Sequence, residues 1–167
     1  MIPEIDALAA ELVAMLQAQG RSFATAESCT GGAISQAVTS VAGCSSVMRG
    51  AVVAYHNDVK EKVLGVSGEV LATYGAVSEE TVVQMVDGVS ALMGADCAVA
   101  TSGIAGPGGG TPEKPVGTVW IAVAGPNGTQ AQEFHFSATR ERNIAKASLQ
   151  ALQWLVESIQ MDMKKGG

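Results

Sequence analysis

A hydroxyl, a thiol and two glycines follow one another where an apolar stretch of the chain ends, in the segment Ala26-Glu27-Ser28-Cys29-Thr30-Gly31-Gly32. Glycines let the backbone approach a ligand, and the free N–H groups of a first helical turn attract a phosphate or a developing oxyanion. The segment therefore offers Ser28 as a nucleophile. Cys29 is the alternative, because a thiol beside a helix N-terminus can have a lowered pKa. Ordinary strand-to-helix turns have similar sequences, so the segment needs a confirming context.

A second segment places a lysine five residues after a tyrosine. A Val-rich strand is predicted to end at Tyr55, and a helix to start near Asp58 with Asn57 as its N-cap. Lys60 would then lie in the first turn, where the helix dipole disfavours an ammonium group. A neutral lysine can act as a base, so Ser28, Tyr55 and Lys60 form a plausible hydroxyl-activating set. The alternative is a solvated helix lysine.

A third segment is a long, glycine-rich loop between two predicted strands, from Thr101 to Trp120. Loops of this length more often form a binding rim or a lid than a simple connection. A flexible surface insertion is the alternative. The loop and the strand end before it contribute the candidate binding residues Ser102, Gly103, Gly106 and Gly108.

Together these segments resemble the C-terminal domain of the competence/damage-inducible protein A (CinA) family, whose stand-alone members include nicotinamide mononucleotide (NMN) deamidases of the PncC type. The resemblance covers the chain roughly from residue 5 to residue 157. It rests on four motifs in the family's order and spacing: Ala26 to Gly32, Tyr55 with Lys60, Gly75-Ala76-Val77-Ser78, and Ser102-Gly103-Ile104-Ala105-Gly106-Pro107 running into Lys114 to Trp120.

The resemblance implies hydrolysis of the NMN carboxamide to nicotinate mononucleotide and ammonia, in pyridine nucleotide salvage. Ser28, Tyr55 and Lys60 stand at the matching catalytic positions. No cofactor and no metal are expected, and a homodimer or larger homo-oligomer is expected on the resemblance alone. The residues expected to bind the substrate are Glu27, Thr30, Gly31, Gly32, Ser102, Gly103, Gly106, Gly108 and Arg140. Candidates for holding the phosphate are the Thr30–Gly32 turn, the Gly106–Gly110 loop and Arg140.

One segment departs from the family's pattern. Members often carry Gly-Asp-Arg with a further arginine four residues on; Arg140 matches the first arginine, but Ile144 occupies the second position. Arg142 would project about 200° around the helix from Arg140, so it is a poor substitute. The change slightly favours a rival function, a nucleotide-binding regulatory module without turnover, whereas the intact Ser28, Tyr55 and Lys60 disfavour it. An amidase or esterase acting on another substrate is a third possibility.

Composition indicates a folded enzyme domain. The 167 residues are 47% hydrophobic and 16% charged, which argues against disorder, and we expect one domain over residues 1–167 with its core at about 5–161. The net charge of −6 gives no electrostatic footprint for nucleic acid. Without a basic leader or a long apolar run, the chain is expected to be cytoplasmic and not bound to a membrane. Three cysteines and two histidines form no zinc-binding pattern.

The elements that must position these residues alternate between helices and strands. Helices are predicted at 5–19 (ended by Gly20), 32–41, 58–65, 68–74, 79–93 (capped by Ser78) and 139–161, and strands at 23–27, 48–55, 97–102, 117–124 and 130–136. A turn at Gly125-Pro126-Asn127-Gly128 makes the last two strands an antiparallel hairpin. This order predicts an α/β fold, a three-layer α/β/α sandwich with a mixed sheet. The tail from Lys164 to Gly167 is expected to fray.

Overall fold

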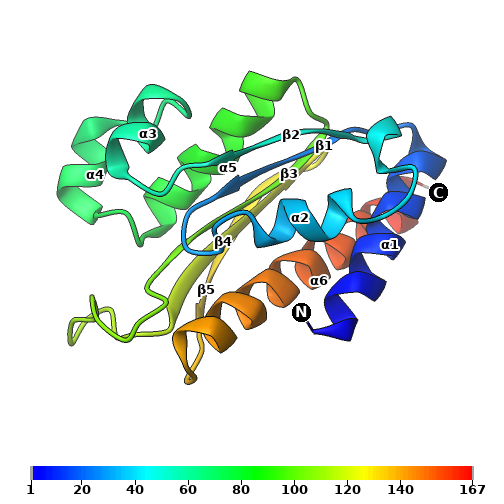
Figure 1. Cartoon of the computed structure of the whole chain (residues 1–167). Coiled ribbons are helices and arrows are strands. Elements are labelled where there is room, and N and C mark those ends of the chain that lie inside the picture. Colours follow the sequence, from blue (N-terminus) through cyan, green and yellow to red (C-terminus); the bar gives the residue numbers. More distant parts are fainter. Residues whose placement is uncertain (1, 167) are drawn as a thin grey trace.

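The computed structural model describes residues 2–166 as a mixed sheet with helices on both faces (Figure 1). The strands are β1 (Phe23–Glu27), β2 (Met48–Val53), β3 (Cys97–Gly103), β4 (Thr118–Gly125) and β5 (Gly128–His135). The helices are α1 (Pro3–Gln19), α2 (Ala33–Thr39), α3 (Asn57–Lys62), α4 (Gly68–Tyr74), α5 (Glu79–Met93) and α6 (Arg140–Gly166), with a short 3-10 helix η1 (Cys44–Ser46). This architecture confirms the predicted α/β/α sandwich.

The sheet has the strand order β2-β1-β3-β4-β5. The strands β2, β1 and β3 are parallel, and β4 and β5 complete the sheet antiparallel to their neighbours. After β1 the chain enters α2 on one face, and after β2 it enters α3 to α5 on the other (Figure 1). Such a reversal opens a crevice at the carboxyl ends of the parallel strands, where open α/β sheets bind ligands.

The two faces of the sheet have different side chains. One face presents Phe23, Val99 and Ile121 to α1, α2 and α6, and these residues share a core with Leu12, Leu152 and others. The other face presents mostly alanines, among them Ala24, Ala26, Ala98, Ala100 and Ala122, to α5 and the segment before it. Small side chains allow α5 to lie close to the sheet, and the alternation follows the two-residue repeat of a strand.

Most predicted boundaries are confirmed within two or three residues. Gly20 ends α1 in the left-handed conformation, and the Ser78 hydroxyl accepts a hydrogen bond from Thr81 N at the start of α5, as expected. The last helix differs from the prediction, because α6 continues beyond Met161 to Gly166. Its last turns are anchored by Asp162, which accepts a hydrogen bond from Asn127 in the β4–β5 turn. Of the tail that was expected to fray, Gly167 lies outside the described residues.

The described residues also bear on two expected absences. No helix within residues 2–166 has both the length and the apolar character that crossing a membrane requires. In the same part of the chain, no three His, Cys, Asp or Glu side chains gather in an arrangement that could hold a metal ion.

Candidate active site at the carboxyl edge of the parallel strands

Ser28 lies immediately after the last residue of β1, in a turn that leads to α2. The turn is fixed at both ends, because Ser28 N donates to Thr101 O on β3 (3.0 Å) and Gly31 N donates back to Ser28 O (3.0 Å). Gly31 and Gly32 have φ angles of 61° and 99°. Only glycine adopts these values readily, which explains the Gly-Gly pair. The backbone thereby presents the Ser28 hydroxyl at the sheet edge.

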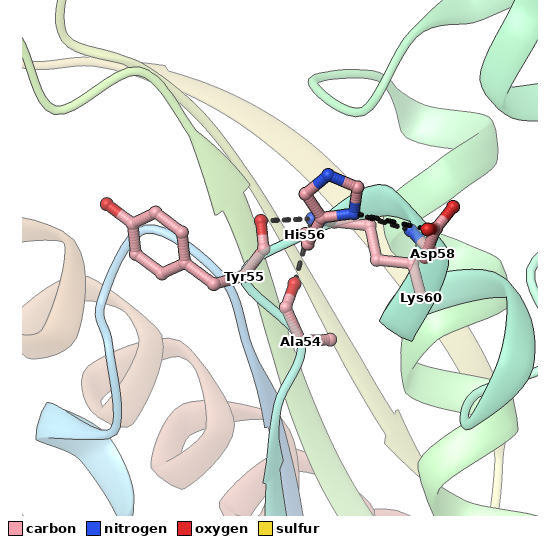
Figure 2. A network of polar contacts seen from close by, with 5 residues as sticks. All are labelled: Ala54, Tyr55, His56, Asp58 and Lys60. Atoms are coloured by element: carbon pink, nitrogen blue, oxygen red, sulfur yellow. Dashed lines mark hydrogen bonds and ion pairs between the residues drawn. The ribbon is translucent and has the colours of Figure 1, made fainter.

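Lys60 reaches this hydroxyl from α3. Its Nζ atom lies 3.0 Å from Ser28 Oγ, 2.8 Å from Ala54 O and 3.3 Å from Tyr55 O. The side chain is only 1% exposed. The two carbonyls belong to the chain between β2 and α3, as Figure 2 shows. A lysine buried this deeply is rare unless it is paired, so Lys60 is not the solvated helix lysine of the alternative reading.

Burial lowers the pKa of Lys60 from its usual 10.5. Removing an ammonium group from water disfavours its charged form, so the neutral amine becomes accessible at lower pH. The predicted cause was the helix dipole, with Asn57 as N-cap. The structure corrects the cap: His56 is the N-cap, its Nδ1 accepting from Asp58 N, and α3 has only six residues. The lowering of the pKa comes from desolvation by burial.

Tyr55 lies at the same site but turns its ring away from Lys60 (Figure 2). Its hydroxyl accepts a hydrogen bond from Arg140 Nη2 (2.7 Å), and Arg140 Nη1 donates to Gly106 O (2.7 Å). The tyrosine is 56% exposed. Only its backbone carbonyl contacts the lysine. The structure therefore brings Ser28 and Lys60 together and places the Tyr55 hydroxyl on Arg140 instead.

A cleft of about 270 Å³ opens in front of Ser28 and Lys60. The glycine-rich loop after β3 forms one wall, and the residues between α4 and α5 contribute to the rim. The lining consists of Ser28, Cys29, Tyr55, Asn57, Lys60, Ala76, Val77, Ser102, Gly103, Ile104, Ala105, Gly106, Gly108, Gly109 and Arg140. Eight of the predicted catalytic and binding residues thus border a single cleft, and the lining contains two basic side chains and no carboxylate.

The loop wall is held by contacts to α6 and α4. Asn143 Nδ2 donates to Ala105 O (3.0 Å), and Lys114 Nζ donates to Tyr74 O (2.7 Å). Gly106 has a φ of 90°, and a Cβ atom there would lie 2.5 Å from the Val116 side chain. The loop therefore folds closely on itself, which favours the predicted binding rim over a loose surface insertion.

The remaining predicted binding residues do not line the cleft. The carboxylate of Glu27 and the hydroxyl of Thr30 are buried behind the nucleophile turn and bond to protein groups. Gly31 and Gly32 shape the turn. All four lie within the short segment from Glu27 to Gly32, which also holds Ser28 and Cys29, so their sequence position alone could not separate cleft contacts from supporting contacts.

Cys29 borders the cleft but is only 6% exposed and packs with the core on the α2 side of the sheet. Burial raises the pKa of its thiol to about 12, and the negative charge of Glu27 adds to this effect. The lowered pKa considered for this residue is therefore wrong. A thiol with so high a pKa is a poor nucleophile, so Ser28 is the better candidate.

Three backbone N–H groups of the turn make no hydrogen bond to another backbone group. Within residues 2–166 these are the groups of Cys29, Thr30 and Gly32, of which only Cys29 lines the cleft, whereas those of Gly31 and Ala33 are used inside the turn. Unpaired N–H groups beside a nucleophile can stabilise a negative oxygen.

The sequence analysis missed other parts of the site for identifiable reasons. The carbonyls of Ala54 and Tyr55 leave no mark in the sequence, because every residue has one. Ala76 and Val77 line the rim. They belong to the Gly75–Ser78 motif, which was noted for the resemblance but not interpreted as part of the site.

The fold and the buried serine–lysine pair define a small α/β/α domain with its candidate site at the carboxyl ends of the parallel strands. A model described as "CinA C-terminal domain" matches residues 5–159, and the chain belongs to this family. The structure is similar to that of competence/damage inducible protein CihA from Agrobacterium tumefaciens, with a TM-score of 0.92, 40% identity, and 96% of this chain and 98% of that chain covered. It is also similar to competence damage-inducible protein A (ComA) from Klebsiella pneumoniae, with a TM-score of 0.90, 40% identity, and 93% and 97% covered.

Curated relatives are longer than this chain. A CinA-like protein from Anaeromyxobacter dehalogenans is 49% identical over 150 residues, which are 90% of this chain and 37% of that protein. One from Parasynechococcus marenigrum is 48% identical over 141 residues, 84% of this chain and 34% of that protein. The chain thus spans about a third of the length of the curated relatives it matches.

Proposed function

We propose that this protein is an amidohydrolase that converts NMN to nicotinate mononucleotide and ammonia, with Ser28 as the nucleophile. The substrate comes from the resemblance described above. The observation that carries the chemistry is the 3.0 Å contact between Ser28 Oγ and the buried Nζ of Lys60. A base within hydrogen-bond distance of a hydroxyl is the geometry that nucleophilic catalysis needs.

The partners of Lys60 favour its action as a base. Ala54 O and Tyr55 O are acceptors only, so they take the two N–H bonds of a neutral amine. The remaining lone pair then points at the Ser28 hydroxyl. In this arrangement Ser28 donates its proton to Lys60 as its oxygen attacks the carboxamide carbon.

The reaction then follows the course of acyl transfer. The C–O bond between Ser28 and the carboxamide carbon forms, and the carbonyl oxygen becomes an oxyanion held by the free N–H groups of the turn. One such donor is worth about 3 kcal/mol in transition-state stabilisation. Lys60 returns the proton to the amide nitrogen, the C–N bond breaks and ammonia leaves. Water then attacks the ester with Lys60 again accepting a proton, and Ser28 is released.

The charge of the cleft supports a phosphate-bearing substrate. Arg140 is a fixed positive charge that lines the cleft, and no carboxylate lines it. A guanidinium group binds phosphate well. Of the three candidates for holding the phosphate, Arg140 and the Gly106–Gly110 loop border the cleft, while no residue of the Thr30–Gly32 turn lines it. We therefore assign the phosphate to the Arg140 side of the cleft.

A substrate panel tests this assignment. We expect ammonia release from NMN, at least tenfold higher in kcat/KM than from nicotinamide riboside or nicotinamide, because only NMN carries the phosphate; about 1.4 kcal/mol of binding corresponds to that factor. Arg140→Gln should remove most of the difference between NMN and the riboside. Equal rates on all three would indicate an amidase for another substrate. Binding of NMN without turnover would favour the regulatory module.

A further inference from the structure

Glu27 is buried completely, yet it is surrounded by hydrogen-bond donors. Its Oε1 accepts from the Thr30 hydroxyl (2.7 Å) and from Ile34 N (3.0 Å). Its Oε2 accepts from the Thr25 hydroxyl (3.0 Å) and from Ser35 N (2.9 Å). The side chain is 0% exposed and does not line the cleft. Four donors on one carboxylate compensate its removal from water, and they leave no room for a substrate group.

Two of these donors belong to the start of α2. Its N-cap, Gly32, has no side chain with which to accept a hydrogen bond. Ile34 and Ser35 are the second and third residues of the helix, whose N–H groups an N-cap side chain normally satisfies. Glu27 supplies both acceptors from β1. It thereby fixes α2, and with it the far end of the Ser28–Gly32 turn, to the sheet.

The same residue connects the other two parts of the site. Its hydrogen bond to Thr30 holds the middle of the turn, and Thr30 continues to the Thr101 hydroxyl (2.8 Å) on β3. Its backbone oxygen accepts from Ala54 N (2.8 Å), and the Ala54 carbonyl in turn accepts from Lys60. Glu27 is therefore joined by hydrogen bonds to the nucleophile turn and to the segment that orients the base.

We infer that Glu27 is a positioning residue: it holds the turn so that Ser28 Oγ meets Lys60 and the N–H groups of Cys29, Thr30 and Gly32 stay unpaired. The inference rests on the proposed function for the reaction that is measured. It replaces the substrate contact expected for Glu27 from its place in the sequence.

Glu27→Gln is the sharp test, because the substitution keeps the shape of the side chain. Whichever way the amide is turned, its NH₂ group faces either Ile34 N–H or Ser35 N–H, and neither backbone donor can be reversed. We expect kcat on NMN to fall roughly 100-fold, the cost of a displacement of about 1 Å in a catalytic geometry, with KM changed less than about twofold. Labelling of Ser28 by a fluorophosphonate, followed by intact-protein mass, should slow in parallel.

Three further variants separate positioning from stability. Thr25→Val removes one donor from the same carboxylate without touching the turn or α2, and should leave kcat within about twofold of wild type. Thr30→Val removes the link to the turn and should lower kcat, and Thr30→Ser should recover most of that loss. If Glu27→Gln does not fold, these three variants still test the inference. The thermal unfolding temperature of each variant is measured as well.

Two outcomes would overturn the inference. An unchanged kcat with a lower unfolding temperature would make Glu27 a purely structural residue, and a raised KM with an unchanged kcat would make it a substrate contact. The labelling distinguishes this failure from that of the proposed function. Wild type that labels at Ser28 but releases no ammonia contradicts the NMN reaction and leaves the Glu27 comparison intact, whereas a wild-type Ser28 that does not label contradicts the positioning as well.

Discussion

Burial of the Lys60 side chain lowers its pKa and so suits it to act as a base. Its amine has three polar partners. Its pKa falls below 10.5 because burial removes the side chain from solvent and disfavours the charged form. The chain has 16 acidic and 10 basic side chains, yet no carboxylate lines the cleft. The acidic neighbour of Ser28, Glu27, is buried behind the turn and bonded to protein donors.

The pH dependence of the reaction follows from this lowered pKa. The base is active when neutral, so kcat/KM should rise with pH through the lowered pKa of Lys60 and level off before 10.5. Because the unfolded chain binds this proton more tightly, the free energy of unfolding should rise with pH between the lowered pKa of the folded state and 10.5. Lys60→Met should abolish the reaction and flatten that slope. Lys62→Met, at an exposed position of α3, is the control. If Lys62→Met shifted the pH profile of kcat/KM as much as Lys60→Met does, the assignment of Lys60 as the base would be contradicted.

The thiols provide a second test at the same scale. Burial raises the pKa of Cys29 to about 12 and that of Cys97 to about 11, whereas Cys44 is only partly buried. A thiolate-directed reagent at pH 8 should therefore label Cys44 much faster than the other two, as peptide mass spectrometry would measure. Guanidinium should make all three react alike. Rapid labelling of Cys29 in the folded protein would reopen its candidacy as the nucleophile.

Among the helices, α5 depends on close packing against the segment that follows α3. A Cβ atom at Gly88 would lie 2.0 Å from Leu64 O, a backbone atom that cannot move alone. Gly88→Ala should therefore destabilise the fold by about 1–3 kcal/mol, although alanine is the better helix former. Urea denaturation would measure the change. Gly68→Ala in α4 is the matched control, because its nearest neighbour is the flexible end of Glu61. Equal losses of stability in Gly88→Ala and Gly68→Ala would show that the close contact at Gly88 is not the cause of the destabilisation.

The elements themselves could largely be predicted from the sequence. Apolar periodicity, Gly20 and Ser78 fix the ends of α1 and α5 through local interactions, so those boundaries are confirmed. The start of α3 was predicted less well, because an Asn is the commoner N-cap but His56 has the extended backbone that the position requires. The extension of α6 depends on a contact from Asp162 to Asn127, which no local pattern reveals.

The motifs that form the candidate site could be predicted from the sequence. Which of their residues line the cleft and which support it from behind could not. Ser28 and Lys60 are brought together as expected. Which side of the turn Glu27 and Thr30 face depends on the alternation along β1 and on the position of α2, which are properties of the assembled sheet. The Tyr55 hydroxyl is drawn to Arg140, which is 85 residues away in the sequence. Contacts over such separations cannot be inferred from spacing.

At the scale of the whole molecule, the cleft lining has no acidic side chain although the chain as a whole is acidic. The net charge is −6, so repulsion by phosphates should prevent DNA binding despite the family's name. An electrophoretic mobility shift at physiological salt should detect no complex with duplex or single-stranded DNA. A salt-sensitive complex would contradict this reading. The expected homo-oligomer stays a prediction, and light scattering would give its mass as a multiple of 17.0 kDa.

The most direct test of the central claim is ammonia release from NMN by purified protein, with and without a chelator, beside Ser28→Ala, Cys29→Ala and Lys60→Ala. The account predicts turnover that the chelator leaves unchanged, that is lost in the serine and lysine variants and that is kept in the cysteine variant. Circular dichroism and NMN binding would show that each variant is folded. Full activity in Ser28→Ala, or no turnover in a folded wild-type protein that still binds NMN, would contradict it.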